Sequence, residues 1–182
     1  MKKSSDWAAI CSASIDTPLG PATAVSREGA LAALWFDDQK SLPAREDLGT
    51  YDPDNVVFEN LRICLAEYFS GINRLLNIRL APQGTDFQKS IWNILLKIPF
   101  GQVTTYGDIA RAAAAERGLS YMSAQAVGSA VGHNPICILI PCHRVIGADR
   151  GLTGYAGGLD KKQALLRIER VDLATAPLYR PS

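Results

Sequence analysis

The sequence is poor in the features that mark several large classes of protein. Its 182 residues include only two histidines and four cysteines, and no two cysteines have the C-x-x-C spacing. A structural zinc site needs four clustered Cys or His ligands, so we expect no metal site. No apolar run approaches the ~20 residues that cross a bilayer. The run 136–141 suits one buried strand, and we expect no membrane segment.

The amino terminus also lacks the pattern of a secretory signal. Two lysines are followed at once by Asp6, and the apolar stretch 7–11 is too short for a signal core. We therefore expect a cytoplasmic protein, in which cysteines stay reduced.

A strong excess of charge of one sign is absent too. The 19 Lys and Arg residues nearly balance 18 Asp and Glu residues, which argues against a strongly basic coat for nucleic acid. The balance hides an asymmetry, because residues 1–83 carry net charge −3 and residues 84–182 carry +4. Such a split either arises by chance or marks the second half as facing an anion. The 47% of hydrophobic and 20% of charged residues are ordinary for a globular chain.

The first half reads as a small antiparallel sheet followed by a helix. Residues 8–15 and 21–36 are apolar and are separated by a Pro/Gly turn, which predicts a β-hairpin or meander. Apolar residues then recur every three or four positions over 54–71, which predicts an amphipathic helix. Alternation over 78–80 predicts a short strand. The pattern breaks next, and we place a domain boundary after Gln83.

The second half reads mainly as short helices. Thr85 and Gln88 have the spacing of a capping box. Two short helices joined by a turn are the shape of a helix-turn-helix. The apolar run 136–140 predicts a buried strand that leads to Cys142. The sequence therefore predicts an α+β protein. The second half is expected to have helices over 85–98, 106–116, 124–131 and 160–171, capped by Thr85, Thr105, Ser123 and Asp160.

Cys142 has neighbours that favour chemistry. The next residues are His143 and Arg144, and a nearby His or positive charge lowers a thiol pKa toward the nucleophilic thiolate. Adjacent residues on a strand point to opposite faces, so direct pairing of the two side chains needs a turn or a bridging water. A third group should orient the imidazole, and Glu169 and Asp172 are both candidates. A bare Cys-His dipeptide is more often a core thiol beside a hydrogen-bonded neighbour.

An ordered set of short motifs adds to this pattern. The motifs are Phe87-Gln88, Trp92, Ile98-Pro99-Phe100-Gly101, Thr105-Tyr106, Ala126-Val127-Gly128, Asn134-Pro135, Pro141-Cys142-His143-Arg144-Val145, Gly154-Tyr155, Gly157-Gly158, Lys162, Leu165-Leu166 and Glu169. With them, the chain resembles the O6-alkylguanine-DNA alkyltransferases (methylated-DNA–protein-cysteine methyltransferases) over roughly residues 80–171. The first 83 residues resemble the variable domain of that family only in size and coarse content.

The resemblance implies a reaction without a cofactor. Cys142 would take an alkyl group from O6 of guanine, with O4-alkylthymine a further substrate, and keep it, so that each molecule acts once. His143 would act as base through a water, with Glu169 orienting it. Tyr106 would donate toward the base and crowd the adjacent phosphate. Arg144 is expected to support the fold rather than to react.

The resemblance also implies residues that bind the substrate. The backbone around Tyr155 and Ala156 would face O6, and the Cys142 and Val145 carbonyls would accept from the exocyclic amine. Asn134 would lie at this site and support the turn between the helix over 124–131 and the strand that leads to Cys142. Ala156 stands where some members have Ser, which is expected to alter the range of alkyl groups accepted.

The expected partner is double-stranded DNA, bound through its minor groove by a monomer. The nucleotide would be flipped out, and a side chain would fill the gap. Gln125 stands at that position, where many members have Arg, so attraction to phosphate is reduced. Thr105, Ser123 and Ala126 are expected to contact DNA beside it.

Three other functions deserve comparison. A helix-turn-helix module that only binds alkylated DNA is one, but such relatives have Trp in place of the reactive Cys. A Cys-His hydrolase is another, and it would need an acyl substrate, an oxyanion hole and repeated turnover. A transcriptional sensor with a zinc half would need ligands that this sequence lacks.

Overall fold

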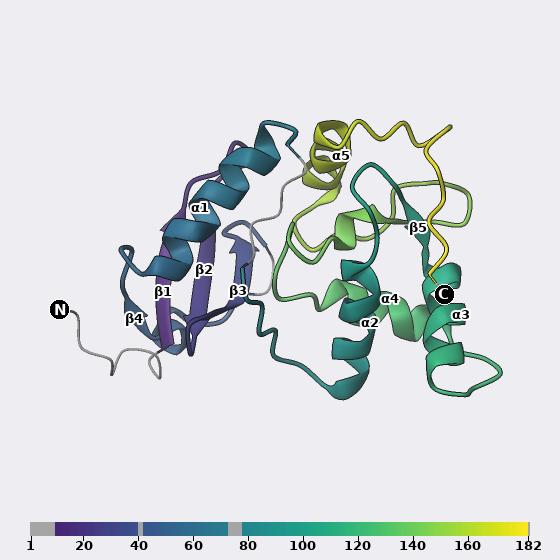
Figure 1. The fold of residues 1–182 in the computed structure, drawn as a ribbon, viewed down its shortest axis with the longest axis horizontal. Coiled ribbons are helices and arrows are strands. Elements are labelled where there is room, and N and C mark those ends of the chain that lie inside the picture. Colours follow the sequence, from purple (N-terminus) through teal and green to yellow (C-terminus); the bar gives the residue numbers. More distant parts are fainter. Residues whose placement is uncertain (1–9, 40–41, 73–77, 182) are drawn as a thin grey trace. The chain divides into compact units, whose positions relative to one another are not determined.

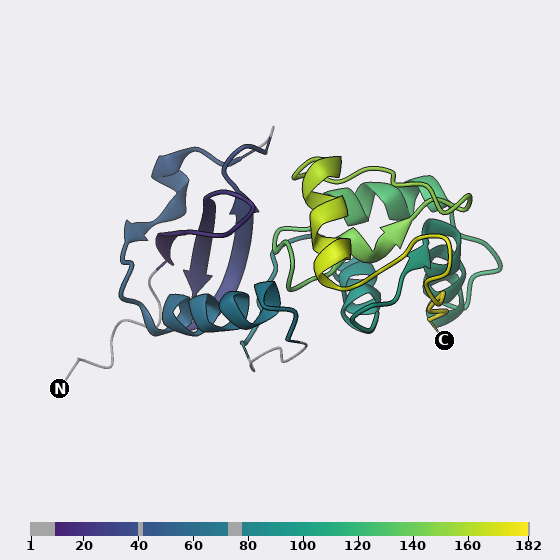
Figure 2. The same ribbon diagram turned by 90° about the horizontal axis from the view of Figure 1, so that it is seen from above.

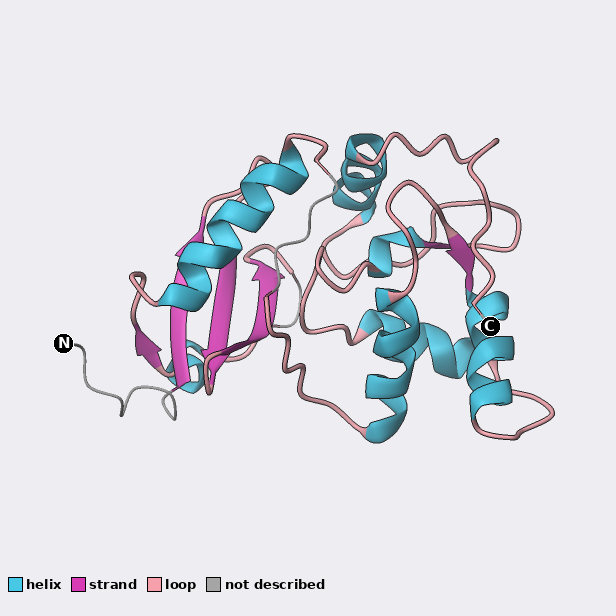
Figure 3. Ribbon diagram, viewed as in Figure 1, coloured by secondary structure: helices cyan, strands magenta, loops and turns pink. Residues whose placement is uncertain are grey.

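The computed structural model describes residues 10–39, 42–72 and 78–181. The chain divides into two compact units, Met1–Gln83 and Gly84–Ser182 (Figure 1). The larger sheet belongs to the first unit, and most helices belong to the second (Figure 3). This confirms the predicted α+β class. Within the described ranges, no helix is long and apolar enough to cross a membrane.

The first unit is built on a four-stranded sheet with the order β3-β2-β1-β4. The strands β1 (Ile10–Ile15), β2 (Ala22–Arg27) and β3 (Ala30–Phe36) form the predicted antiparallel meander. A fourth strand, β4 (Thr50–Tyr51), was not predicted, and it runs parallel to β1. The chain reaches β4 through a loop with the 3-10 helix η2 (Arg45–Leu48) instead of a hairpin, and so returns in the direction of β1.

Helix α1 (Val56–Phe69) packs against this sheet (Figure 2). Asn55 caps it by accepting a hydrogen bond from Val57 N, and the helix ends close to Gly71, as predicted. Its buried side includes Phe58 and Leu61.

Two predicted strands, one from alternation over 78–80 and one from the apolar run 136–140, are absent from the structure. Over 78–80 the chain makes only an isolated bridge between Leu80 and Leu31. Over 136–140 it makes buried tight turns, with Ile140 N bonded to Ile136 O at 3.1 Å and Ile138 at a φ of +67°. The Asn134 side chain bonds Ile136 N and Ile140 O, so it satisfies backbone groups that a neighbouring strand would otherwise pair.

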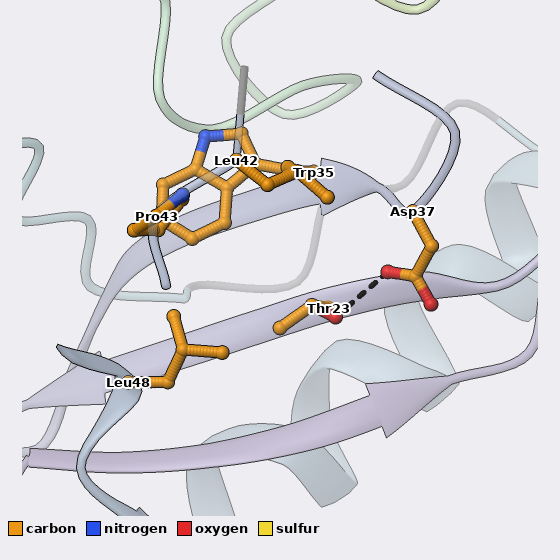
Figure 4. Close-up of a pocket in the computed structure, with 6 residues that line it drawn as sticks. All are labelled: Thr23, Trp35, Asp37, Leu42, Pro43 and Leu48. Atoms are coloured by element: carbon orange, nitrogen blue, oxygen red, sulfur yellow. Dashed lines mark hydrogen bonds between the residues drawn. The ribbon is translucent and has the colours of Figure 1, made fainter. Parts of the chain in front are cut away.

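A hollow of about 230 Å³ lies in the first unit (Figure 4). Thr23 and Trp35 line it from paired positions on β2 and β3, facing Leu48 from the following loop. The Thr23 hydroxyl donates to Asp37 Oδ1 at 2.7 Å. Because neighbours on a strand alternate, these side chains point away from buried Ala24.

In the second unit, three helices pack on one another: α2 (Asp86–Leu96), α3 (Tyr106–Glu116) and α4 (Ala124–Gly132). The predicted capping box at the start of α2 is present. The buried Trp92 indole donates to the Ala130 carbonyl at 2.9 Å and ties α2 to α4. The helices α3 and α4 form the predicted helix-turn-helix.

A short pair of parallel strands connects the start of α3 to the segment after the cysteine. Strand β5 (Thr104–Thr105) pairs with β6 (Val145–Ile146), which directly follows the 3-10 helix η3 (Cys142–Arg144). Helix α5 (Leu159–Ile168) comes last. Asp160 was predicted to cap this helix. The helix instead begins directly after Gly158, because Gly158 at a φ of +90° redirects the chain first.

Candidate active site

Cys142 is the first residue of η3, and its side chain is buried with 7% exposed. The Asn134 side-chain amide donates a hydrogen bond to Cys142 Sγ at 3.1 Å. The same amide donates to the Ile140 carbonyl at 2.8 Å. Asn134 therefore couples the turns before the cysteine to the sulfur atom itself. Its place in the sequence beside Pro135 indicated a turn but not this bond.

His143 and Glu169 form a buried pair behind the thiol. His143 Nε2 lies 2.6 Å from Glu169 Oε1, and both side chains have no exposed surface. An ionised carboxylate only accepts hydrogen bonds, so Nε2 carries the proton. The other candidate, Asp172, is exposed and bonds Ala174 N and the Thr175 hydroxyl instead. The structure thus separates two carboxylates that the sequence could not rank.

Arg144 binds the same carboxylate as His143. Its Nε donates to Glu169 Oε2 at 2.8 Å, and its Nη2 donates to Oε1 at 2.9 Å. The backbone N–H of Gly101 adds a bond to Oε2 at 3.2 Å. Arg144 also donates to the Ile98 carbonyl at 2.6 Å, so it anchors Glu169 to the end of α2. A buried Arg needs an acidic partner. That need is the one indication that the sequence gives of the contact between Arg144 and Glu169.

Lys162 of α5 is fully buried and ends among carbonyl oxygens. It donates to Val145 O at 2.6 Å, to Thr153 O at 2.6 Å and to Gly154 O at 3.3 Å. The loop 147–158 is thereby tied to the segment after the cysteine. The Val145 carbonyl, expected to accept from the base, already accepts from Lys162, and its second lone pair can accept another donor.

Tyr106, the first residue of α3, reaches the same loop. Its hydroxyl donates to Thr153 O at 3.4 Å, the carbonyl that Lys162 also binds. Further along the loop, Tyr155 is half-buried and Ala156 is exposed. The structure therefore brings Tyr106 and the loop of Tyr155 and Ala156 to one place.

The residues expected at DNA lie at helix starts. The hydroxyls of Thr105 and Ser123 accept from backbone N–H groups as N-caps of α3 and α4. The hydroxyl oxygens of Thr105 and Ser123 are thus engaged within the protein. The side chains of Gln125 and Ala126 are exposed. A Cβ added at Gly128 of α4 would lie 3.7 Å from the Tyr106 ring, so α4 and Tyr106 are neighbours.

Burial sets the protonation of the thiol and the imidazole. It raises the pKa of Cys142, against the Asn134 hydrogen bond and the charge of Lys162, which lower it. It lowers the pKa of His143, against the hydrogen bond and charge of Glu169. The resting pair is therefore a neutral thiol and a neutral imidazole.

The two buried charges differ in how well they are compensated. Burial works to raise the pKa of Glu169, but bonds and charges from His143 and Arg144 bring it to about 2. Burial lowers the pKa of Lys162 to about 8, and the charge of Cys142 opposes this. Among the residues that the structure describes, no three His, Cys, Asp or Glu side chains group as metal ligands.

The fold and the site define a helix-turn-helix unit built around a buried cysteine with a His-Glu pair. A profile described as "6-O-methylguanine DNA methyltransferase, DNA binding domain" matches residues 86–171. Methylated-DNA–protein-cysteine methyltransferases are similar over most of the chain. That of Mycobacterium tuberculosis is 42% identical over 86% of this chain and 90% of its own length. That of Methanosarcina barkeri is 42% identical over 87% and 96%.

Solved structures agree with these sequence relatives. The crystal structure of Mycobacterium tuberculosis OGT in complex with DNA is 41% identical, covers 88% of this chain and 92% of that chain, and has a TM-score of 0.76. The Mycobacterium tuberculosis O6-methylguanine methyltransferase has a TM-score of 0.77 at 41% identity, over 88% and 93% of the two chains. The chain belongs to the 6-O-methylguanine DNA methyltransferase family.

Proposed function

We propose that this protein repairs alkylated DNA by direct reversal. Cys142 takes a methyl or larger alkyl group from O6 of guanine and keeps it, so each molecule reacts once. The observation that carries this proposal is the buried Cys142 sulfur, bonded by Asn134 and followed by the His143–Glu169 pair. The names of the relatives support the same activity.

The reaction is a displacement at carbon. A bond forms between Cys142 Sγ and the alkyl carbon as the bond from that carbon to O6 breaks, and the electron pair leaves with the guanine. The thiol proton passes to His143, and the guanine takes up one proton in return. No metal or cofactor enters this balance.

The neutral resting pair explains why a base is needed. Because burial raises the pKa of Cys142, the thiol does not ionise unaided at neutral pH. His143 is neutral and gives Nε2–H to Glu169, so Nδ1 offers its lone pair. Cys142 and His143 are consecutive on a 3-10 helix, where side chains diverge by about 120°. This supports a relay through a bridging water.

Charges and donors around the sulfur favour the thiolate once it forms. Asn134 donates to the sulfur directly, and the charge of Lys162 lowers the thiol pKa. Tyr106 then donates toward the base, which develops negative charge as it leaves. The loop backbone at Tyr155 and Ala156 faces O6 in this arrangement.

DNA binds through its minor groove to α4. A base stacked in a duplex cannot reach a buried sulfur, so the nucleotide is flipped out of the helix. Gln125 and Ala126 are exposed on the first turn of α4, and Gln125 occupies the gap left by the base. Thr105 and Ser123 fix where α3 and α4 begin, and so place the backbone of these helix starts at the DNA.

The two units then have different tasks. Residues 84–182 are the DNA-binding and catalytic domain, and residues 1–83 are the variable domain. The protein acts as a monomer on a single lesion. A cytoplasmic location suits a thiol that must stay reduced.

Intact mass spectrometry tests the proposal. After mixing with duplex DNA that contains O6-methylguanine, the protein should gain the mass of one methyl group, mapped to Cys142. Excess DNA should add no second group, and Cys142→Ser should gain none. An unchanged protein that still binds this DNA would establish a binding module instead. Repeated turnover would contradict single use.

A further inference from the structure

The turn between α3 and α4 is longer than a helix-turn-helix requires. Seven residues, 117–123, separate the helices, whereas three or four suffice. The turn is ordered at its start, because Gly118 has a φ of +64° and Leu119 N bonds Ala114 O at 2.8 Å. In Figure 1 it forms the loop beyond the end of α3. The first residues of the turn are therefore held in a defined position.

This turn and one side of α3 enclose a hollow of about 360 Å³. From α3 it is lined by small side chains at helical spacing and by Arg111. From the turn it is lined by Leu119, Tyr121 and Met122. Leu119 and Tyr121 are large side chains that remain 53% and 76% exposed. Exposed aromatic and apolar groups beside a hollow mark a binding surface.

Arg111 brings a guanidinium to the hollow. Its side chain is 73% exposed, yet it is paired with the buried carboxylate of Asp108, which Thr105 also bonds. The guanidinium is thus held in place while most of its five N–H donors face outward. Arg117, the first residue of the turn, differs from Arg111, because it donates to Ser90 Oγ at 3.0 Å and stacks over the Phe87 ring.

The hollow lies beside residues that are assigned to the DNA face. Gly107 and Ala124 line it, and each is the chain neighbour of a residue assigned to the DNA face, Tyr106 and Gln125. A ligand that continues from that face and suits both an arginine and apolar side chains is the backbone of the DNA itself.

We propose that this hollow binds the sugar–phosphate backbone of the duplex beside the flipped nucleotide. Arg111 contacts a phosphate, and Tyr121 and Leu119 pack against deoxyribose. The long turn thus adds an anchor outside α4, where Gln125 contributes no charge. The inference rests on the proposed function, since it takes DNA as the ligand.

Salt-dependent DNA binding tests the anchor. Arg111→Ala should weaken binding to a short duplex about 3- to 10-fold and reduce the slope of log affinity against log salt by about 1. Tyr121→Ala should weaken binding without changing that slope. Arg117→Ala is the matched control, because it removes the same charge from the start of the turn, next to α3, and should leave the slope unchanged. Circular dichroism melting verifies that each variant is folded.

Trimmed duplexes locate the contact. Removing base pairs from one side of the lesion should abolish the difference between Arg111→Ala and the wild type, and removing them from the other side should preserve it. If Arg111→Ala and Tyr121→Ala bind like Arg117→Ala, the anchor is refuted. The anchor is also refuted if the variants lose only the ability to bind close together along long DNA while their affinity for a short duplex is unchanged. That outcome indicates a protein–protein contact. If the wild type binds DNA but gains no methyl group, the proposed function fails while the anchor is still measured.

Discussion

The two units bury different kinds of side chain. In the described part of the first unit, the buried polar residues are two serines, Ser12 and Ser26, among small and large apolar groups. The second unit buries His143, Arg144 and Glu169, besides Lys162, Asp108 and two neutral polar residues. A charge taken out of water costs several kcal/mol unless partners replace its hydration. The comparison shows that one unit is built for packing and the other carries costly charges next to its thiol.

The buried charges persist because each has several partners. The Glu169 carboxylate accepts from His143, Arg144 and Gly101, and the Lys162 ammonium donates to three carbonyls. Such partners offset desolvation without adding much net stability. What the second unit gains is a fixed imidazole and a positive charge near the sulfur of Cys142. The first unit has no such demand and relies on apolar burial.

The largest effect is expected from breaking this network at Arg144. Arg144→Ala leaves the buried Glu169 without two of its donors, and it should lower the free energy of unfolding by about 3–5 kcal/mol. Urea titration measures it. The control is Lys97→Ala, which removes an exposed ion pair with Glu116 and should cost about 1 kcal/mol or less. Equal costs for the two variants would remove the contrast between buried and exposed charge.

Acid should destabilise the second unit by a similar but smaller amount. The pKa of Glu169 falls from 4.5 to about 2 on folding, so its contribution is complete above pH 4.5 and is lost as pH falls toward 2. At about 1.4 kcal/mol for each pH unit, the loss is about 3 kcal/mol. Urea titrations from pH 6 to 2 measure it. Asp172→Asn, which changes an exposed carboxylate, should keep the loss. A flat profile for the wild type would show that folding does not lower the pKa of Glu169.

The two histidines allow a matched test of the base. His143→Ala should slow methyl transfer at saturating DNA by about 100-fold or more, because the thiol loses its proton acceptor, while DNA affinity stays the same. His133→Ala is the control, since His133 lies at the end of α4 and bonds Ser129 O at 2.7 Å. Single-turnover kinetics measures both. Equal rates for His143→Ala and the wild type would remove His143 from the mechanism.

Mild alkali should affect rate and stability in opposite directions. Above pH 8, Lys162 loses its proton, and with it the charge that favours the Cys142 thiolate, so transfer should slow up to about tenfold. The unfolded chain still binds that proton up to its pKa of 10.5, so stability should rise over the same interval. Transfer rates and urea titrations at pH 7.5–9 measure the effects on rate and on stability. A rate that climbs with pH would show that thiol ionisation outweighs Lys162.

Local signals predicted most of the fold. The capping residues Thr85, Thr105 and Ser123 start α2, α3 and α4 where expected, because a cap acts within three residues of itself. The turns over 136–140 escaped prediction, since burial alone does not reveal the course of the backbone. Their backbone groups are paired by each other and by Asn134, which an apolar run cannot show.

The site was less accessible to sequence reasoning than the fold. Cys142 and His143 are adjacent, so their association needed no structure. The choice of Glu169 over Asp172, and its bond with Arg144 across 25 residues, depends on how α5 returns to η3. The contact of Asn134 with the sulfur likewise depends on the turns between them. Spacing along the chain carries no information about such tertiary distances.

The smallest effect is expected in the first unit. Thr23→Val removes the hydroxyl that donates to Asp37 at the hollow of Figure 4, while keeping a β-branched side chain on β2. Because Asp37 is exposed, water replaces the lost donor, and the free energy of unfolding should change by about 1 kcal/mol or less. The rate of methyl transfer should not change, since Cys142 and the side chains around it lie in the second unit. Urea titration and single-turnover kinetics on this variant test both statements. A loss as large as that of Arg144→Ala would show that polar contacts in the two units are equally critical, and a slower transfer would show that the first unit takes part in the reaction.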